Sequence, residues 1–415
     1  MGLIGATLLG GVSLLTLASQ GATSPSPVVV ALAPALPGPI EPHIAGTTQT
    51  QPTDPAPPPQ ANAAPVALLV DLASGRTLYE RDADKPFLPA SVTKTMTAFV
   101  AFEMLAKGEL RADQRITVSD PAWKEWHTKG SRMFLERGSQ PTVDDLLMGI
   151  MNVSANDGAV VLAEGAAGSV PAWVAKMNDA AQRLGMTHSH FGTPNGWMDK
   201  GNTYVSARDL VKLASAMIER YPDYYRRYVG RPGLTWNGIT QANHDPTLGV
   251  VPGADGIKTG FTGEAHYNFL GSAQRDGRRL VMVLAGVERP AQRTAAAKAL
   301  LEWGFHEWEG KPLLAAGTAL GTAQVQGGTA TQVPLVAPRD MLLTLPKGTA
   351  TPQTTMRVVY TGPLVAPIAK GTPVAELEIK LGDAPPARLP LTAGADVPKG
   401  GAVDRLRYGF TRLIS

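Results

Sequence analysis

The sequence predicts an α+β domain in which one antiparallel sheet is covered by helices, followed by a small all-β domain. Two strand patterns come first, helical patterns fill the middle, and three strand patterns follow. Elements in this order form one sheet covered by helices, because each apolar face must be buried against another layer. From about Gly310 the pattern changes to short β-branched runs between Gly and Pro residues. We therefore expect domains at 64–309 and 310–397.

The first two strands are predicted at 65–72 and 77–81, because a largely apolar run is followed by a Ser-Gly turn and a second run. Apolar residues at helical spacing then predict a helix over 91–106. Four further segments carry helical patterns: 143–151, 157–165, 170–184 and 207–218. These helices supply the apolar faces that cover the sheet.

Three more strands are predicted at 256–262, 267–273 and 279–287, and a helix over 291–303 closes this part of the chain. The segment 275–278 (Arg-Asp-Gly-Arg) joins the last two strands, and its Asp-Gly pair is a strong hairpin signal. The β-rich remainder contains four runs typical of strands: 323–333, 341–345, 356–360 and 374–381.

Both ends of the chain carry segments that differ from the predicted domains. Residues 1–22 begin with an uncharged apolar run followed by small residues, which indicates a secretory signal peptide; an uncleaved membrane anchor is the alternative. Residues 23–63 are rich in Pro and Ala and almost uncharged, so they are predicted to be a disordered linker. The tail 398–415 places apolar residues on one helical face, and four basic residues against one acidic residue give it a net charge of +3. This pattern is typical of an amphipathic helix on a membrane surface, and a packed or frayed helix is the alternative.

Composition narrows the classes of function. The 415 residues carry a formal net charge of +3, with no Lys- or Arg-rich run and no interleaving of basic and aromatic residues. Nucleic-acid binding is therefore not expected. The chain has no Cys, which excludes disulfides, thiol nucleophiles and Cys-ligated zinc.

A possible nucleophile and base stand at the start of the helix predicted over 91–106. Ser91 and Lys94 are three residues apart, so they share a helix face and the amine can reach the hydroxyl. A serine needs such a base to become nucleophilic, and a lysine acts as a base only when burial or a nearby cation lowers its pKa. A serine that caps the helix, beside a surface lysine, is the alternative.

Two further motifs follow. Ser154 and Asn156 lie in a short loop between two predicted helices, where the hydroxyl can relay a proton and the amide can bind a carbonyl; a helix N-cap is the alternative. Lys258, Thr259 and Gly260 lie on a predicted strand. There the lysine can hold a carboxylate and lower the pKa of the first motif's lysine, and the glycine permits close approach of a ligand backbone. A lysine on an edge strand beside a turn is the alternative.

The three motifs in this order, on these elements, resemble those of the low-molecular-mass D-alanyl-D-alanine carboxypeptidases, which are penicillin-binding serine peptidases. The resemblance covers roughly 64–305, and the β-rich domain and tail match in character. It is carried by six segments: 89–94, 129–135, 156–157, 191–196, 206–209 and 255–262. It implies a fold like that of the serine β-lactamases and transpeptidases.

The resemblance also implies roles for individual residues. Ser91 would be the acylated nucleophile and Lys94 its general base, with Ser154 and Asn156 as the second catalytic motif. Substrate binding would fall to the third motif and its neighbours: Lys258, Thr259, Gly260, Phe261, Thr262 and Arg293. The backbone N–H groups of Ser91 and Phe261 would form the oxyanion hole. Arg293 would lie near the substrate's terminal carboxylate, which its fork can bind at two points; a surface arginine is the alternative.

Three departures from the family pattern concern residues expected to lie near the bound substrate. Residues 263–267 read Gly-Glu-Ala-His-Tyr, where the family usually has Ala-Gly before the Tyr. His244 and Asp245 stand where many relatives carry Arg-Asn, and Phe261 occupies a position that is often polar. These departures bear on carboxylate recognition and substrate preference, and not on the acylation chemistry.

The function that the resemblance implies is removal of the terminal D-alanine from peptidoglycan stem peptides ending in D-Ala-D-Ala, through an acyl-enzyme on Ser91. β-Lactam antibiotics would acylate the same serine, and no metal or organic cofactor would be required. The expected location is the periplasm, with peripheral attachment to the inner membrane through the tail.

Other functions share these motifs. A D,D-endopeptidase that cuts cross-links would use the same residues. A class A β-lactamase needs a glutamate that activates water between the second and third motifs, and no convincing loop of that kind lies between Asn156 and Lys258. A catalytically inactive wall-binding relative is the alternative from another class, and the three intact motifs disfavour it.

Overall fold

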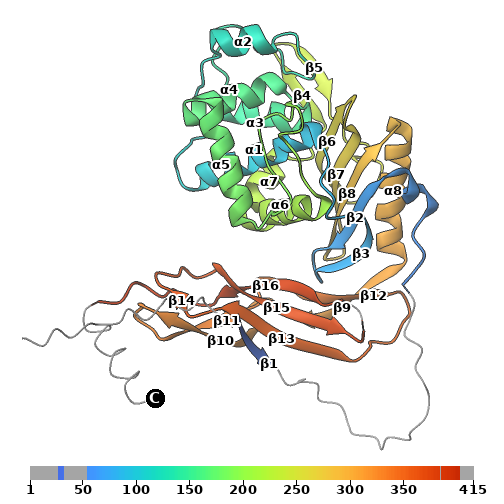
Figure 1. Cartoon of the computed structure of the whole chain (residues 1–415), viewed down its shortest axis with the longest axis vertical. Helices are drawn as coiled ribbons and strands as arrows, with labels where there is room; N and C mark the ends of the chain where they lie inside the picture. The colour runs from blue at the N-terminus through green and yellow to red at the C-terminus, as the bar shows by residue number, and fades with distance from the viewer. Residues whose placement is uncertain (1–26, 32–53, 384, 402–415) are drawn as a thin grey trace, which may run out of the picture.

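The computed structural model describes residues 27–31, 54–383 and 385–401 (Figure 1). Its upper part is built on an antiparallel five-stranded sheet with the strand order β3-β2-β8-β7-β6. The strands are β2 (Val66–Asp71), β3 (Arg76–Arg81), β6 (Ala254–Thr262), β7 (His266–Arg275) and β8 (Arg278–Val287). The antiparallel sheet predicted from the sequence is therefore confirmed.

The sheet is buried on both faces. Successive residues of a strand point to opposite sides, so Leu68 of β2 joins the core beneath the helical layer while Leu69 joins a second core. Helix α8 (Pro290–His306) and the 3₁₀ turn η1 (Pro59–Ala63) cover this second face. The predicted arrangement of a sheet between helices follows from this alternation.

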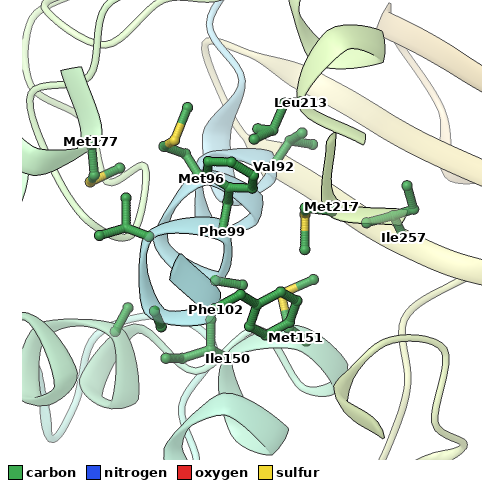
Figure 2. Close-up of a cluster of buried hydrophobic side chains, with 14 of the residues drawn as sticks. Val92, Met96, Phe99, Phe102, Ile150, Met151, Met177, Leu213, Met217 and Ile257 are labelled. Atoms are coloured by element: carbon green, nitrogen blue, oxygen red, sulfur yellow. The ribbon is translucent and has the colours of Figure 1, made fainter. Parts of the chain in front are cut away.

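Helix α1 (Lys94–Ala106) runs through the middle of the helical layer, and its side chains are buried on every side (Figure 2). The surrounding helices are α2 (Asp120–Trp126), α3 (Val143–Asn152), α4 (Asn156–Ala167), α5 (Val170–Arg183), α6 (Ala207–Arg220) and α7 (Pro222–Tyr228). Phe99 and Phe102 of α1 pack within this layer, where Ile150 of α3 and Met217 of α6 also lie (Figure 2). Because α1 is enclosed, a polar residue at its start is removed from water.

Three elements of this part were not predicted. The short helices α2 and α7 are two of them, and the third is a hairpin of β4 (Gly233–Trp236) and β5 (Ile239–Ala242). Its turn residues Asn237 and Gly238 have φ values of +47° and +75°. An Asn-Gly pair adopts this left-handed turn readily, so the sequence does contain a signal for the hairpin.

The lower part of the molecule is the predicted all-β domain (Figure 1). A seven-stranded sheet has the order β1-β13-β15-β16-β11-β10-β14, and β12 pairs separately with β9. The strands are β1 (Pro27–Ala31), β9 (Trp308–Leu314), β10 (Ala319–Gln326), β11 (Gln332–Val336), β12 (Met341–Pro346), β13 (Thr354–Thr361), β14 (Leu364–Val365), β15 (Pro373–Leu381) and β16 (Ala387–Ala393). Apolar residues such as Val325, Leu335 and Leu377 form its own core.

A buried ion pair within the upper sheet is hydrogen-bonded to the β9–β12 pair. Asp71 at the end of β2 accepts hydrogen bonds from Arg278 Nε and Thr344 Oγ1, each at 2.8 Å. Arg278 also donates to the carbonyl of Trp308 at 2.7 Å. Because Asp71 and Arg278 are both buried, this contact fixes the β9–β12 pair against the central sheet.

The expected disordered linker at 23–63 needs a correction. Residues 27–31 form β1, which pairs antiparallel with β13, and the described chain resumes at Asp54. Ala61 of η1 is buried in the core beneath α8. A segment poor in large apolar residues can still contribute edge hydrogen bonds and small buried side chains, which the compositional argument overlooked. The predicted signal peptide and all of the amphipathic tail beyond residue 401 lie outside the described residues.

Among the described helices, none is by itself long and apolar enough to cross a membrane. Helices α4 and α5 meet the length and composition criterion together, with an 89° bend between them. Both belong to the helical layer around α1.

Candidate active site

Ser91 lies in a tight 3₁₀ turn, η2 (Ala90–Thr93), that leads directly into α1. The preceding residue, Ala90, has a φ of +48°, a backbone conformation that is costly for a residue with a Cβ atom. Two glycines permit the close packing that holds this turn. A Cβ atom on Gly196 would lie 1.8 Å from the Ala90 carbonyl oxygen, and one on Gly260 would lie 2.4 Å from the Pro89 carbonyl oxygen. The turn is therefore clamped between two backbone segments.

Lys94 has no solvent exposure, which excludes the surface lysine considered above. Its Nζ atom lies 2.8 Å from Ser91 Oγ, 2.7 Å from Asn156 Oδ1 and 2.8 Å from the Asn195 carbonyl oxygen. An ammonium group would donate in all three contacts, whereas the neutral amine donates to two of these oxygens and accepts a hydrogen bond from the Ser91 hydroxyl. Burial, and then the positive charge of Lys258, hold the pKa of Lys94 well below its usual range, while Asp157 acts in the opposite direction. The neutral amine, which is the form that acts as a base, is thereby favoured.

Ser154 and Asn156 lie where α3 ends and α4 begins. Ser154 has a φ of +61°, and no side-chain hydrogen bond caps α4, so the simple N-cap interpretation is wrong. The Asn156 side chain accepts from Lys94 and donates to the Lys129 carbonyl at 3.4 Å. It therefore connects the first motif to the segment 129–135.

The segment 129–135 is held by the residue that follows the second motif. Asp157 accepts hydrogen bonds from the backbone N–H groups of Met133 at 3.0 Å and Leu135 at 3.1 Å. Gly130 packs so closely that an added Cβ atom would lie 2.6 Å from Asn156 Nδ2. The carboxylate thus positions one wall of the site, a role that the sequence reasoning did not assign to it.

The third motif lies on β6, which packs along η2. Lys258 is 3% exposed and Thr259 is also buried, although β6 is an edge strand of its sheet. Lys258 Nζ donates to the Thr259 carbonyl at 3.0 Å. Burial lowers the pKa of Lys258 to about 7, with Asp245 opposing the shift and Arg293 adding to it. The expected repulsion between the lysines of the first and third motifs is therefore present.

Arg293, near the start of α8, is half buried and lies beside Tyr267 at the start of β7. Its guanidinium lies 5.6 Å from the centroid of the Tyr267 ring, on which the exposed ring of Phe261 stacks at 4.3 Å. Thr262 pairs with His266 at the end of the β6–β7 hairpin. Five of the predicted substrate-binding residues thus follow one another on β6, from buried Lys258 past exposed Phe261, and Arg293 is connected to Phe261 through the Tyr267 ring.

Sequence reasoning missed the backbone contribution of residues 193–196. The Asn195 carbonyl accepts from Lys94, and Thr97 Oγ1 holds the Pro194 carbonyl at 2.6 Å. The turn is closed by Thr193 Oγ1, which accepts from the Gly196 N–H at 3.0 Å. A Thr-Pro-Asn-Gly sequence signals a turn, but it does not indicate which carbonyl faces a lysine.

The arrangement supplies a serine, a buried amine with a lowered pKa beside it, and a second buried lysine on the neighbouring strand β6. Such a set can take the proton of the serine, acylate its oxygen with a carbonyl substrate and bind an anionic end of that substrate. Within the described residues there is no group of three or more His, Asp or Glu side chains that could hold a metal ion.

Comparisons with known proteins agree with this geometry. A sequence model of the D-alanyl-D-alanine carboxypeptidases matches residues 49–289, and one of the penicillin-binding protein 5 C-terminal domain matches 308–399. The D-alanyl-D-alanine carboxypeptidase DacA of Haemophilus influenzae is 34% identical over 355 residues, which cover 84% of this chain and 88% of that protein.

Two solved structures are similar as well. Penicillin-binding protein 5 from Haemophilus influenzae has a TM-score of 0.65 at 33% identity, covering 84% of this chain and 99% of that one. Penicillin-binding protein D2 from Listeria monocytogenes, in its ampicillin-bound form, has a TM-score of 0.51 at 30% identity, covering 59% of this chain and 97% of that one. The chain therefore belongs to the D-alanyl-D-alanine carboxypeptidase family, and it is a serine-type peptidase with the family's C-terminal β domain.

Proposed function

We propose that this protein removes the terminal D-alanine from peptidoglycan stem peptides, with Ser91 as the nucleophile. The observation that supports this most directly is the 2.8 Å contact between Ser91 Oγ and the buried Nζ of Lys94. In the first step neutral Lys94 takes the hydroxyl proton while Oγ bonds to the carbonyl carbon of the penultimate D-alanine. The backbone N–H groups of Ser91 and Phe261 stabilise the oxyanion that forms.

The leaving group then departs. The peptide C–N bond breaks, and the proton held by Lys94 returns to the amine of the terminal D-alanine through the hydroxyl of Ser154. Asn156, which already accepts from Lys94, holds the amine beside Ser91. Water next attacks the ester and Lys94 accepts its proton. The bond between the acyl carbon and Ser91 Oγ then breaks, and Lys94 returns the proton to Oγ with release of the shortened peptide.

The third motif binds the carboxylate end of the substrate. Protonated Lys258 and Arg293 supply positive charge beside the Ser91 turn, and the Thr259 hydroxyl adds a neutral donor. A β-lactam places its own carboxylate there and acylates Ser91, after which water removes it slowly.

We further propose that the protein is exported and acts in the periplasm. The apolar run within 1–22 supports export, and the basic amphipathic pattern of 398–415 supports peripheral attachment to the inner membrane.

Intact mass after mixing the full chain with benzylpenicillin tests this function. A long-lived adduct that is absent in Ser91→Ala and present in the control Ser139→Ala, together with D-Ala release from a D-Ala-D-Ala peptide, is expected. Penicillin consumption without an adduct would instead indicate a β-lactamase. Neither adduct nor consumption, in a folded protein, would leave a catalytically inactive wall-binding protein. Release of products from cross-linked peptides only would indicate an endopeptidase.

A further inference from the structure

A small depression adjoins the turn that carries the nucleophile. Its lining comes from the residue before Ser91, from the turn after residues 193–196 and from the hairpin that follows β6, and it includes Ala90, Trp197, Met198, Asp199, Thr262 and Glu264. With its open mouth included, the depression measures about 290 Å³, which is room for one amino-acid side chain. The acylation steps proposed above make no use of it.

A peptide bound in the proposed orientation extends towards this depression. Its carboxylate lies beside Lys258, and its scissile carbonyl faces the backbone N–H of Phe261, further along β6. A strand advances about 3.3 Å per residue, so the residue that precedes the D-Ala-D-Ala pair comes level with Thr262 and the turn after it. Thr262 lines the depression, as does Ala90, the neighbour of Ser91. The side chain of that preceding residue is therefore the part of the peptide that can enter the depression.

The wall that Trp197 forms is apolar and firmly held. The Trp197 N–H donates to Asn195 Oδ1 at 3.0 Å, and the ring meets the Trp126 ring edge-on, with the centroids 5.6 Å apart. A Cβ atom on Gly130 would lie 2.9 Å from Trp197 Cζ3, so the ring is closely packed there as well. The next residue, Met198, is 52% exposed. An aliphatic chain laid against these two side chains would bury apolar surface that now faces water.

Glu264 brings a negative charge to the depression from the turn between β6 and β7. This turn is closed by the Ala265 N–H, which donates to Thr262 Oγ1 at 3.1 Å, and by the pairing of Thr262 with His266. The side chain of Glu264 is exposed, and within the described part of the chain it has no hydrogen-bond or ion-pair partner. Its carboxylate is therefore available to a donor that a ligand brings.

The second acid of the lining, Asp199, is used by the protein itself. Its two oxygens accept from the Thr203 N–H at 3.0 Å and from the Thr203 hydroxyl at 2.5 Å. The lining contains these two acids and no Lys, Arg or His. An apolar wall beside an unneutralised carboxylate suits a ligand group that is aliphatic along its length and positively charged at its end.

We propose that Glu264 is a specificity-determining residue, and that the depression takes an aliphatic side chain ending in a protonated amine, carried by the residue before the D-Ala-D-Ala pair. The proposal rests on the proposed function, because it assigns the part of the peptide next to the bond that is cut. The methylene groups of this side chain lie along Trp197 and Met198, and its amine pairs with Glu264. Acetylation of the amine removes the charge and therefore this contact.

The experiment measures kcat/KM for D-Ala release from two peptides, acetyl-L-Lys-D-Ala-D-Ala and the same peptide acetylated on the lysine side chain. The ratio of the two values reports recognition of the ammonium group, and any steric effect of the acetyl group cancels when variants are compared. We expect the ratio to be about two- to fivefold higher in the wild type than in Glu264→Gln, as befits an exposed ion pair. Glu264→Lys, which repels the amine, should have a lower ratio than Glu264→Gln.

Two further variants separate charge from apolar contact. Met198→Ser should lower kcat/KM for both peptides about twofold and leave their ratio unchanged. Glu109→Gln, on an exposed residue beyond the far end of α1, is the matched control and should keep the wild-type ratio. Thermal unfolding of each variant checks that it is folded.

The same ratio in the wild type, Glu264→Gln and Glu264→Lys would overturn the assignment of Glu264. Wild-type kcat/KM values in Met198→Ser would overturn the placing of the aliphatic chain. Both results leave D-Ala release and the penicillin adduct intact. Failure of the proposed function itself would be recognised by the absence of both in the wild-type protein.

Discussion

Lys94 and Arg293 are both basic residues of the proposed active site, yet their surroundings differ. Lys94 is fully buried, and its Nζ atom has three hydrogen-bond partners in the protein. Arg293 is half buried, and its Nε atom is without a partner in the described structure. On the nucleophile side, around Ser91 and Lys94, the lysine amine has three partners, although Thr93 Oγ1 and Asn195 Nδ2 are buried without one among the described residues. On the carboxylate side, around Arg293, the unpaired donor belongs to the cation itself, and a ligand could supply the acceptor. Acylation geometry is therefore preorganised, and substrate preference is set where the protein leaves donors unused.

The largest effect on the acylation rate should come from removing the proposed base on the nucleophile side. Lys94→Ala leaves Ser91 without a proton acceptor, and we expect acylation by benzylpenicillin to slow by about 10³-fold or more. The second-order rate of adduct formation, followed by intact mass, measures this. Lys107→Ala, at the exposed end of the same helix, is the control and should acylate at the wild-type rate. Rapid acylation of Lys94→Ala would mean that another group is the base.

A Cβ atom at position 260 should perturb the nucleophile turn without changing any polar group. In Gly260→Ala the new atom would lie 2.4 Å from the Pro89 carbonyl oxygen and 3.1 Å from the Ser91 nitrogen, so the turn must shift. We expect acylation to slow by about 10²-fold. Gly263→Ala is the matched control, because nothing lies within 4 Å of its added Cβ atom. Similar rates for the two variants would contradict the idea of a clamped turn.

The charge of Lys258 acts on Lys94 and is also proposed to bind the substrate carboxylate. Its removal therefore tests whether the nucleophile side and the carboxylate side are coupled. The charge of Lys258 lowers the pKa of Lys94, and Lys258→Met should raise that pKa again. Less of Lys94 is then in the neutral form at pH 7. The acylation rate should therefore fall about tenfold at pH 7 and recover at higher pH. The pH profile of the acylation rate measures the shift. A profile with a lower rate but the wild-type midpoint would show that Lys258 acts on the substrate alone.

The smallest of these effects is expected at Arg293. Arg293→Ala removes a cation from the carboxylate side and leaves the Ser91–Lys94 contact intact. KM should therefore rise about five- to tenfold while kcat changes little. Steady-state D-Ala release measures both constants. Lys298→Ala, exposed on the same helix, should match the wild type. If kcat falls and KM is unchanged, Arg293 acts on the chemical step and the contrast between the two sides is wrong.

The nucleophile side, around Ser91 and Lys94, was also the part of the site that could be predicted better from the sequence. Helical spacing alone places Lys94 within reach of Ser91, and the buried α1 follows from apolar residues on all its faces. The Asn195 carbonyl could not be predicted, because a backbone oxygen leaves no mark in the sequence and depends on how residues 193–196 pack onto α1. Sequence spacing also did not indicate that Asp157 holds the segment 129–135.

The carboxylate side, around Arg293, depends on contacts between segments far apart in the chain. Arg293 was identified only by resemblance, and its position over Tyr267 depends on how α8 packs against β7. The unpaired state of Asp245 Oδ2 could not be anticipated, since it reflects the local turn with Thr247. The strand at 27–31 was missed for a related reason. It forms because β13, far away in the sequence, offers an edge for pairing, and the Pro-rich segment itself carries little signal for a strand.

That strand has a consequence for how copies of the protein meet. β13 has β15 on one side and β1 on the other, so β1 occupies backbone N–H and C=O groups that would otherwise form an open sheet edge. Open edges recruit strands from other molecules. A chain that begins after residue 31 would present β13 uncovered, and a full-length neighbour could donate its own β1 to it. Since β1 is itself the edge strand of this sheet, removing the N-terminal segment would move the open edge from the five-residue β1 to the eight-residue β13 without touching a catalytic residue.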